Sequence, residues 1–120
     1  MTWVILTVPE FDRWFEELDS ADRDRLDAPI RALEAIGPVL GRPYVDTLNA
    51  SRHANMKELR KPGSTLRVFF AFDPKRRAVL LIGGDKSGEK AFYERMIPIA
   101  DRLFDEHLAD CETQVGESSE

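Results

Sequence analysis

The apolar positions near the start of the chain predict a strand followed by a helix. Residues 3–7 form an apolar, β-branched run that is typical of a buried strand. Thr7 and Glu10 have the spacing of a capping box, and Pro9 suits a first helical turn. The next apolar residues recur at i, i+3, i+4 and i+7 and so share one helical face: Phe11, Trp14, Phe15 and Leu18.

A second helix is predicted directly after the first. Ser20 can cap it, Pro29 lies inside it, and Gly37-Pro38 should end it. Its apolar face is formed by three residues at helical spacing: Leu26, Ile30 and Leu33. The two helices should form a hairpin that covers one face of a sheet.

The centre of the chain predicts that sheet. Residues 38–54 show no clear periodicity and are expected to form a connecting loop. Three predicted strands follow, at 56–60, 66–72 and 78–82, and short turn sequences separate them. This spacing predicts an antiparallel meander, which Gly83-Gly84 should end.

The last helix is predicted over about residues 89–108, because Phe92, Met96, Ile99 and Leu103 share one face. The acidic residues 113–120 are expected to be disordered. The chain should therefore be a single α+β domain over residues 1–112, with a tail at 113–120.

Composition narrows the class of protein. The chain has 120 residues, 42% of them hydrophobic and 32% charged, which suits one globular domain. It has no apolar run long enough to span a membrane and no signal-peptide pattern, so a cytoplasmic protein without membrane association is expected. Cys111 is the only cysteine, and with only His53 and His107 beside it no zinc constellation, metal or cofactor is expected.

Charge is distributed unevenly along the chain. The net charge is −5, which alone argues against a nucleic-acid partner. Residues 52–102, however, contain twelve basic and six acidic residues, and therefore carry a charge of +6. Both flanking segments are acidic. This central segment is therefore the part of the fold expected to face a polyanion, if one binds.

Three basic residues are candidates for binding a phosphate. Strand alternation places Arg67 on a face that it shares with Phe69, and predicts that Glu58 and Arg60 point to the open face of the sheet. Lys86 lies in a glycine-containing loop that lacks the spacing of a phosphate loop. If Arg60, Arg67 and Lys86 converge on one exposed patch, with Glu58 among them, the patch suits a phosphodiester.

These segments resemble a known family. Residues 56–60 (MKELR), 66–70 (LRVFF) and 79–86 (VLLIGGDK), followed by a terminal helix, are similar to the RelE/ParE toxin superfamily, and most similar to its HigB and phage-derived host-killing branch. The resemblance covers roughly residues 3–110. It implies a toxin of a type II toxin–antitoxin pair, a ribosome-dependent endoribonuclease that cuts messenger RNA in the ribosomal A site and needs no cofactor.

The resemblance also implies roles for individual residues. Arg67 matches the strand arginine that contacts RNA phosphate in the family, Arg60 the basic residue that closes the previous strand, and Lys86 the basic residue of the loop before the last helix. Tyr93 lies near a tyrosine that some RelE members use. Where RelE members have two lysines, this chain has Met56 and Glu58, and its acidic pI is a further departure from the family.

Metal-free cleavage needs a base for the 2′-hydroxyl and positive charge on the phosphorane. Glu58 is one candidate base and His53 is the alternative, while Arg60 and Arg67 would stabilise charge. Lys86 would be a stabiliser or an acid. His107 is expected to be structural. Four further basic residues would bind RNA without reading its sequence: Lys57, Lys61, Arg76 and Arg77.

Partners and alternative functions follow from the same resemblance. The family implies a cognate antitoxin, often a HigA-like helix-turn-helix protein, together with the ribosome and messenger RNA. Members of the ParE type inhibit DNA gyrase on the same fold, and a catalytically inactive module that binds a partner is a third alternative.

Overall fold

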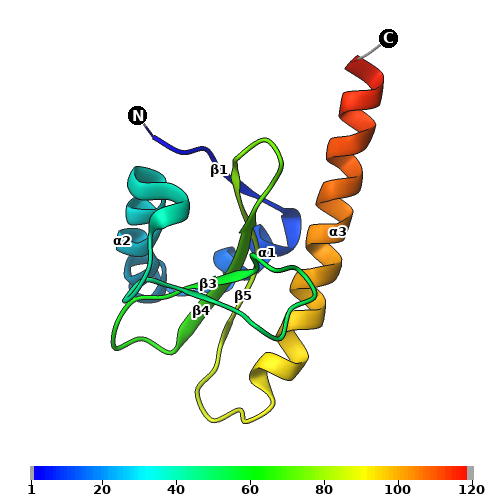
Figure 1. Cartoon of the computed structure of the whole chain (residues 1–120). Coiled ribbons are helices and arrows are strands. Elements are labelled where there is room, and N and C mark those ends of the chain that lie inside the picture. Colours follow the sequence, from blue (N-terminus) through cyan, green and yellow to red (C-terminus); the bar gives the residue numbers. More distant parts are fainter. Residues whose placement is uncertain (1, 119–120) are drawn as a thin grey trace.

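Five strands form one mixed sheet, in a computed structural model that describes residues 2–118 and the side chains of residues 2–112 (Figure 1). The strand order is β1-β5-β4-β3-β2. The strands are β1 (Ile5–Thr7), β2 (Val45–Thr47), β3 (Lys57–Leu59), β4 (Leu66–Phe72) and β5 (Ala78–Asp85). All neighbours are antiparallel except β1, which pairs with β5 in parallel. The α+β prediction is confirmed, but a purely antiparallel sheet is wrong at the β1 edge.

Helices cover both faces of the sheet (Figure 1). The hairpin of α1 (Pro9–Glu17) and α2 (Ser20–Ile36) packs on one face, and α3 (Phe92–Ser118) packs on the other. Side chains alternate across β4, so Val68 and Phe70 join the α1–α2 core while Phe69 and Ala71 join the α3 core. The sheet therefore separates two apolar clusters.

The helix starts differ in detail from the prediction. Thr7 does not cap α1, because it is still part of β1, opposite Leu80. The extended chain continues to Val8, which takes the N-cap position without a side-chain hydrogen bond. Asp19, not Ser20, caps α2, and its carboxylate accepts from the backbone N–H of Asp22.

The predicted end of the last strand is wrong. β5 continues through Gly83 and Gly84 to Asp85. A Cβ atom at Gly83 would lie 2.2 Å from the ring of Trp14, and one at Gly84 would lie 2.8 Å from the ring of Phe92. The two glycines therefore let α1 and α3 approach the sheet closely instead of breaking the strand.

The loop predicted over residues 38–54 contains two short elements. A 3-10 turn, η1 (Gly37–Val39), follows α2, and β2 forms the outer edge of the sheet. The edge strand was missed because it has only three residues and no alternating pattern.

The last helix is longer than predicted. It begins at Phe92 and extends to Ser118, ten residues beyond the predicted end. The side chains of residues 113–118 and all of residues 119–120 lie outside the described part, so disorder of the tail stays a prediction. Within residues 2–118, no helix is both long enough and apolar enough to cross a membrane.

Candidate functional site

One carboxylate oxygen joins three of the predicted site residues. Oε1 of Glu58 lies 2.9 Å from Nη1 of Arg60, 3.2 Å from the hydroxyl of Tyr93 and 3.5 Å from Nε of Arg67. The Glu58 side chain is only 4% exposed. The structure thus brings four of the five predicted catalytic residues together beneath α3.

Strand register and one helical turn position these side chains. Glu58 pairs with Phe69 across β3 and β4, so both lie on the face that α3 covers. Arg67 is two residues earlier on β4 and shares that face. Tyr93 comes from the first turn of α3, where its ring stacks on Phe69 at 6.1 Å and meets Phe92 edge-on at 5.2 Å.

Arg67 is buried, which the sequence did not predict. Its Nη1 donates to the carbonyl oxygens of Ser64 and Leu66, at 2.8 and 2.9 Å. Its Nε is buried and has no hydrogen-bond partner within the described part of the chain. The predicted single exposed patch is therefore wrong for Arg67 and Glu58, because an arginine paired with a carboxylate can be buried where an unpaired one cannot.

Arg60 lies at the margin of this cluster. Its side chain is 23% exposed, and its Nε donates to the carbonyl oxygen of Pro43 at 3.3 Å. A second carboxylate, that of Asp46, lies 3.6 Å from its Nη2. Glu58 pairs with the buried Arg67, and Arg60 is shared between Glu58 and Asp46, so the positive charge that solvent can reach lies on Arg60.

The hydroxyl of Tyr93 is kept protonated by its surroundings. Burial raises its pKa, and the hydrogen bond to Glu58 and the negative charge of that residue raise it further, while Arg67 acts in the opposite direction. At neutral pH Tyr93 is therefore a hydrogen-bond donor to Glu58.

Tyr93 also faces a surface cleft of about 420 Å³. The cleft lies between the loop that follows β2 and the first turns of α3. It is lined by Ala50, Arg52, Tyr93, Glu94, Ile97, Pro98 and Asp101. Through Tyr93, the cleft meets the buried cluster of Glu58, Arg60 and Arg67.

Lys86 is at the same end of the sheet but is not joined to the cluster. It directly follows β5, its backbone N–H donates to the carbonyl oxygen of Thr65 at 3.0 Å, and its side chain is half-buried. Among the described residues, no hydrogen bond or ion pair links the Lys86 side chain to Arg60, Arg67 or Glu58. The predicted convergence of all three basic residues is therefore only partly found.

His53, the alternative base, is held elsewhere. Its Nε2 lies 2.8 Å from Oδ1 of Asp105, and its ring packs edge-on against Phe104. Asp105 is twelve residues beyond Tyr93 on α3, which is roughly 18 Å along the helix. His53 therefore helps to fix its loop on α3 and does not approach Glu58.

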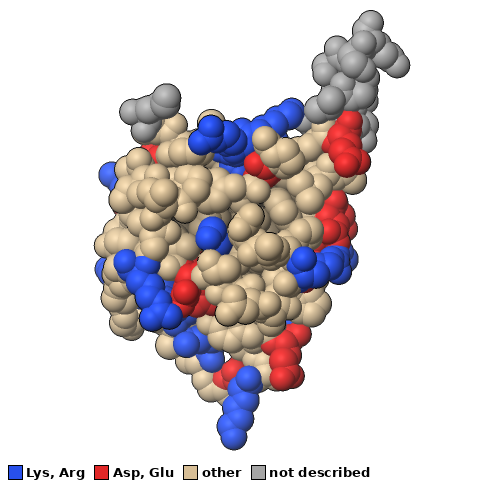
Figure 2. Space-filling model, in the orientation of Figure 1, with Lys and Arg blue, Asp and Glu red and all other residues tan. Residues whose placement is uncertain are grey.

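The four predicted RNA-binding residues are scattered. Lys57 donates to the hydroxyl of Thr47 at 3.2 Å, and Lys61 is exposed in the turn after β3. Arg76 and Arg77 lie in the β4–β5 turn, at the far end of β4 from Arg67. Figure 2 shows basic and acidic side chains interspersed on the face it displays, so no continuous basic surface forms there.

Arg77 belongs to a cluster that the sequence analysis missed. It pairs with the buried Asp73 at 2.8 Å. Burial would raise the pKa of Asp73, but hydrogen bonds from His107 and Arg77 lower that pKa to about 2. His107 and Cys111 complete the cluster from α3, one helical turn apart. The His-x-x-x-Cys spacing is visible in the sequence, but the fold that brings Asp73 beside it is not.

Comparisons with known proteins place the chain in a family. A family model described as phage derived protein Gp49-like (DUF891) matches residues 13–105. A Mycobacterium tuberculosis (strain ATCC 25618 / H37Rv) relative named "Putative toxin HigB3" is 46% identical over 106 residues, which covers 88% of this chain and 93% of the relative. A HigB2 relative from the same organism is 46% identical over 110 residues, and this chain spans about half, 54%, of its length.

Solved structures show the same fold at low sequence identity. The isolated Escherichia coli RelE toxin matches with a TM-score of 0.60 and 11% identity, covering 81% of this chain and 98% of that one. The toxin–antitoxin complex RelE–RelB from Pyrococcus horikoshii OT3 matches with a TM-score of 0.57 and 17% identity, covering 73% and 99%. At these identities the likeness concerns the fold alone.

Proposed function

Since this chain belongs to the Gp49-like family of phage-derived proteins and is a relative of the HigB toxins, we propose that it is the toxin of a type II toxin–antitoxin pair and acts as a ribosome-dependent messenger-RNA endonuclease. The observation that carries the proposal is the buried cluster around Glu58, which Tyr93 connects to an open cleft. It combines positive charge, an acceptor and a protonated hydroxyl at one place.

Cleavage of RNA without a metal begins with attack of the 2′-oxygen on the adjacent phosphorus. The 2′-hydroxyl must lose its proton, and the bond from phosphorus to the 5′-oxygen must break. The products are a 2′,3′-cyclic phosphate and a 5′-hydroxyl, whose oxygen takes a proton from water. Arg60 and Arg67 supply positive charge for the phosphorane that forms between these steps.

Burial suggests an indirect path for the first proton. The Glu58 side chain is 4% exposed and cannot easily contact a substrate. Tyr93 lines the cleft and donates to Glu58. In the proposed step, the 2′-hydroxyl gives its proton to the Tyr93 oxygen as Tyr93 passes its own proton to Glu58.

The ribosome is proposed to orient the RNA. A cleft of about 420 Å³ does not enclose a strand, and holding the reacting atoms in line contributes much of the rate in such reactions. The purified chain should therefore cut protein-free messenger RNA poorly.

A cognate antitoxin is the proposed partner. Structural neighbours were solved as RelE–RelB complexes from Pyrococcus horikoshii and Methanococcus jannaschii. We infer that this chain likewise binds an antitoxin, of the HigA-like helix-turn-helix type. Co-expression with the product of the adjacent gene should restore growth if that gene encodes the antitoxin.

The proposal is tested by expressing the chain and following translation, messenger-RNA ends and DNA supercoiling. We expect arrest of amino-acid incorporation, with transcripts cut only when ribosomes are present. Tyr93→Phe should lose most of the cutting, while the exposed and distant Arg76→Gln should retain it. Efficient cutting of protein-free RNA would reject ribosome dependence. Gyrase inhibition, or growth without any effect on translation, would reject the nuclease.

A further inference from the structure

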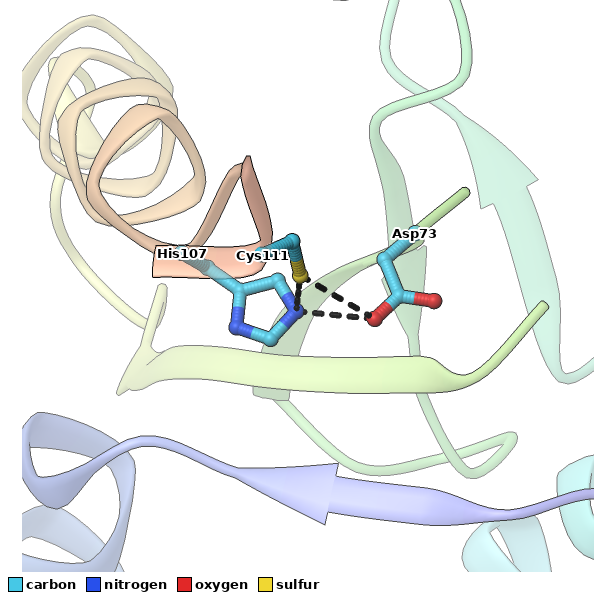
Figure 3. Close-up of side chains that lie close together, drawn as sticks. All are labelled: Asp73, His107 and Cys111. Atoms are coloured by element: carbon cyan, nitrogen blue, oxygen red, sulfur yellow. Dashed lines mark hydrogen bonds and ion pairs between the residues drawn. The ribbon is translucent and has the colours of Figure 1, made fainter. Parts of the chain in front are cut away.

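Three potential metal ligands meet at the end of β4 that is far from Arg67. Asp73 follows β4 directly, and His107 and Cys111 project toward it from neighbouring turns of α3 (Figure 3). Nε2 of His107 lies 2.8 Å from Oδ2 of Asp73 and 3.4 Å from Sγ of Cys111. The sulfur lies 3.9 Å from the same carboxylate oxygen.

These residues do not form a nucleophilic triad. In such a triad, one imidazole nitrogen contacts the carboxylate while the other contacts the nucleophile. Here Nε2 of His107 faces both Asp73 and Cys111. In a triad, Asp73 would orient the ring through the nitrogen that does not face the thiol. Here one nitrogen contacts both groups, so the ring cannot act as a base toward Cys111 in that way.

The three donor atoms instead suit a divalent metal ion. All lie within 4.8 Å of one another. A tetrahedral zinc ion, with bonds of about 2.0–2.3 Å, separates neighbouring donors by roughly 3.2–3.7 Å, which falls inside the observed range of 2.8–3.9 Å. We propose that Asp73, His107 and Cys111 form a zinc site that joins the β4–β5 turn to the C-terminal half of α3.

The chemistry of the donors favours zinc over harder ions. A thiolate and an imidazole are typical zinc ligands, whereas magnesium and calcium prefer oxygen ligands alone. Binding forms bonds from Oδ2, Nε2 and Sγ to the ion, and the thiol releases its proton to solvent. The ion carries a charge of +2 and Arg77 carries +1, while the Asp73 carboxylate and the Cys111 thiolate carry −1 each. These charges sum to about +1, so the ion is not placed in a strongly positive site.

The surroundings of Asp73 hold its carboxylate in position. Oδ1 accepts from the backbone N–H groups of Lys75 and Arg77, at 3.0 and 2.9 Å. The guanidinium of Arg77 donates from Nε to Oδ2 at 2.9 Å. The backbone donors to Oδ1 are outer partners of the kind that orient a metal ligand. The guanidinium of Arg77 contacts the proposed ligand atoms themselves, because its Nη2 lies 2.8 Å from Oδ2 of Asp73 and 3.6 Å from Sγ of Cys111, and it must therefore shift when an ion binds.

A cavity lies beside Cys111, which is the one of the three ligands that lines it. The cavity has a volume of about 410 Å³ and is lined by Pro74, Lys75, Leu108, Cys111 and Glu112. Water or the carboxylate of Glu112 could complete the coordination from there. This site is independent of the cluster around Glu58 and of the proposed nuclease activity.

The test uses the untagged chain, because a histidine tag would bind metal itself. The metal-free protein is titrated with Co²⁺ as a spectroscopic substitute for Zn²⁺. We expect a thiolate-to-cobalt charge-transfer band with one equivalent bound, displacement of the cobalt by Zn²⁺, and a higher thermal midpoint with zinc. The Cys111→Ser and His107→Gln variants should lose the band and the midpoint shift.

His53→Gln is the matched control, because His53 also contacts an aspartate on α3 but has no cysteine beside it. This variant should bind cobalt as the wild type does. Circular dichroism of the metal-free variants separates loss of binding from loss of folding. A wild-type chain without the band, or equal zinc affinity in the wild type and Cys111→Ser, would overturn the proposal.

Discussion

At the scale of single residues, Oε1 of Glu58 holds the candidate site together. Replacing Glu58 by Gln leaves Arg60 and Arg67 adjacent, without the carboxylate that offsets their repulsion. Because the group is buried, we expect Glu58→Gln to lower the free energy of unfolding by about 1–3 kcal/mol. Urea unfolding at neutral pH measures this change.

Glu89→Gln is the control for that loss. Glu89 also accepts two hydrogen bonds from an arginine, Arg95, but both side chains are in contact with solvent. Exposed ion pairs contribute little, so this variant should change stability by less than about 1 kcal/mol. Equal losses in Glu58→Gln and Glu89→Gln would contradict the importance of the buried oxygen.

The raised pKa of Tyr93 gives a pH dependence of stability. The folded chain holds the hydroxyl proton more tightly than the unfolded chain, so the contribution is complete below the unfolded pKa of about 10. It is lost as the pH rises through the folded pKa. The wild type should therefore lose stability more steeply above pH 10 than Tyr93→Phe, as measured by urea unfolding at a series of pH values. Parallel curves for the two proteins would contradict this.

The chemical types at the site could be predicted from the sequence, but their burial could not. Strand alternation correctly placed Glu58 and Arg67 on one face. That α3 covers this face depends on contacts between segments far apart in the chain, such as the stacking of Tyr93 on Phe69. Arg77 shows the same limit, since its pairing with Asp73 depends on the conformation of the β4–β5 turn.

At the scale of elements, a glycine in β5 allows a helix to pack closely on the strand. The ring of Trp14 on α1 lies where a Cβ atom of Gly83 would be, at 2.2 Å. We expect Gly83→Ala to force α1 away from β5 and to cost about 1–3 kcal/mol of stability. A shift of the urea midpoint measures the loss.

Gly41→Ala provides the matched control for Gly83→Ala. No atom of the described residues lies within 4 Å of a Cβ atom built at Gly41, and its φ is not positive. The substitution should be neutral or should stabilise the fold by up to about 1 kcal/mol, because alanine has less freedom in the unfolded chain. A comparable loss in the two variants would show that the packing of Trp14 is not the cause.

Periodicity predicted the long elements and failed on the short ones. β4 was predicted with the observed bounds because seven consecutive residues carry the pattern. β2 has only three residues, and its place at the sheet edge depends on pairing with β3. The start of β5 was predicted correctly, but its C-terminal end was predicted three residues too early, because Gly83 and Gly84 are turn residues in most contexts. The approach of helices from both faces explains these two glycines.

At the scale of the whole molecule, the sheet separates two sites. The cluster around Glu58 lies near the start of β4, while Asp73 and its neighbours lie past its other end. The seven residues of β4 span roughly 20 Å. Basic residues occur near both ends, so net charge does not reveal which end a polyanion would contact.

Two exposed residues distinguish these ends. Lys61 directly follows Arg60, whereas Arg76 lies in the β4–β5 turn, with its guanidinium 5.1 Å from the centre of the Trp3 ring. If RNA binds beside Arg60, Lys61→Gln should weaken ribosome binding. The slope of log affinity against log salt concentration should also fall in magnitude by about one, because one phosphate contact is lost. Arg76→Gln removes the same charge at the far end and should leave both quantities unchanged. Sedimentation of each variant with ribosomes over a range of salt concentrations measures both quantities. A larger loss of binding in Arg76→Gln than in Lys61→Gln would place the RNA at the opposite end of the sheet.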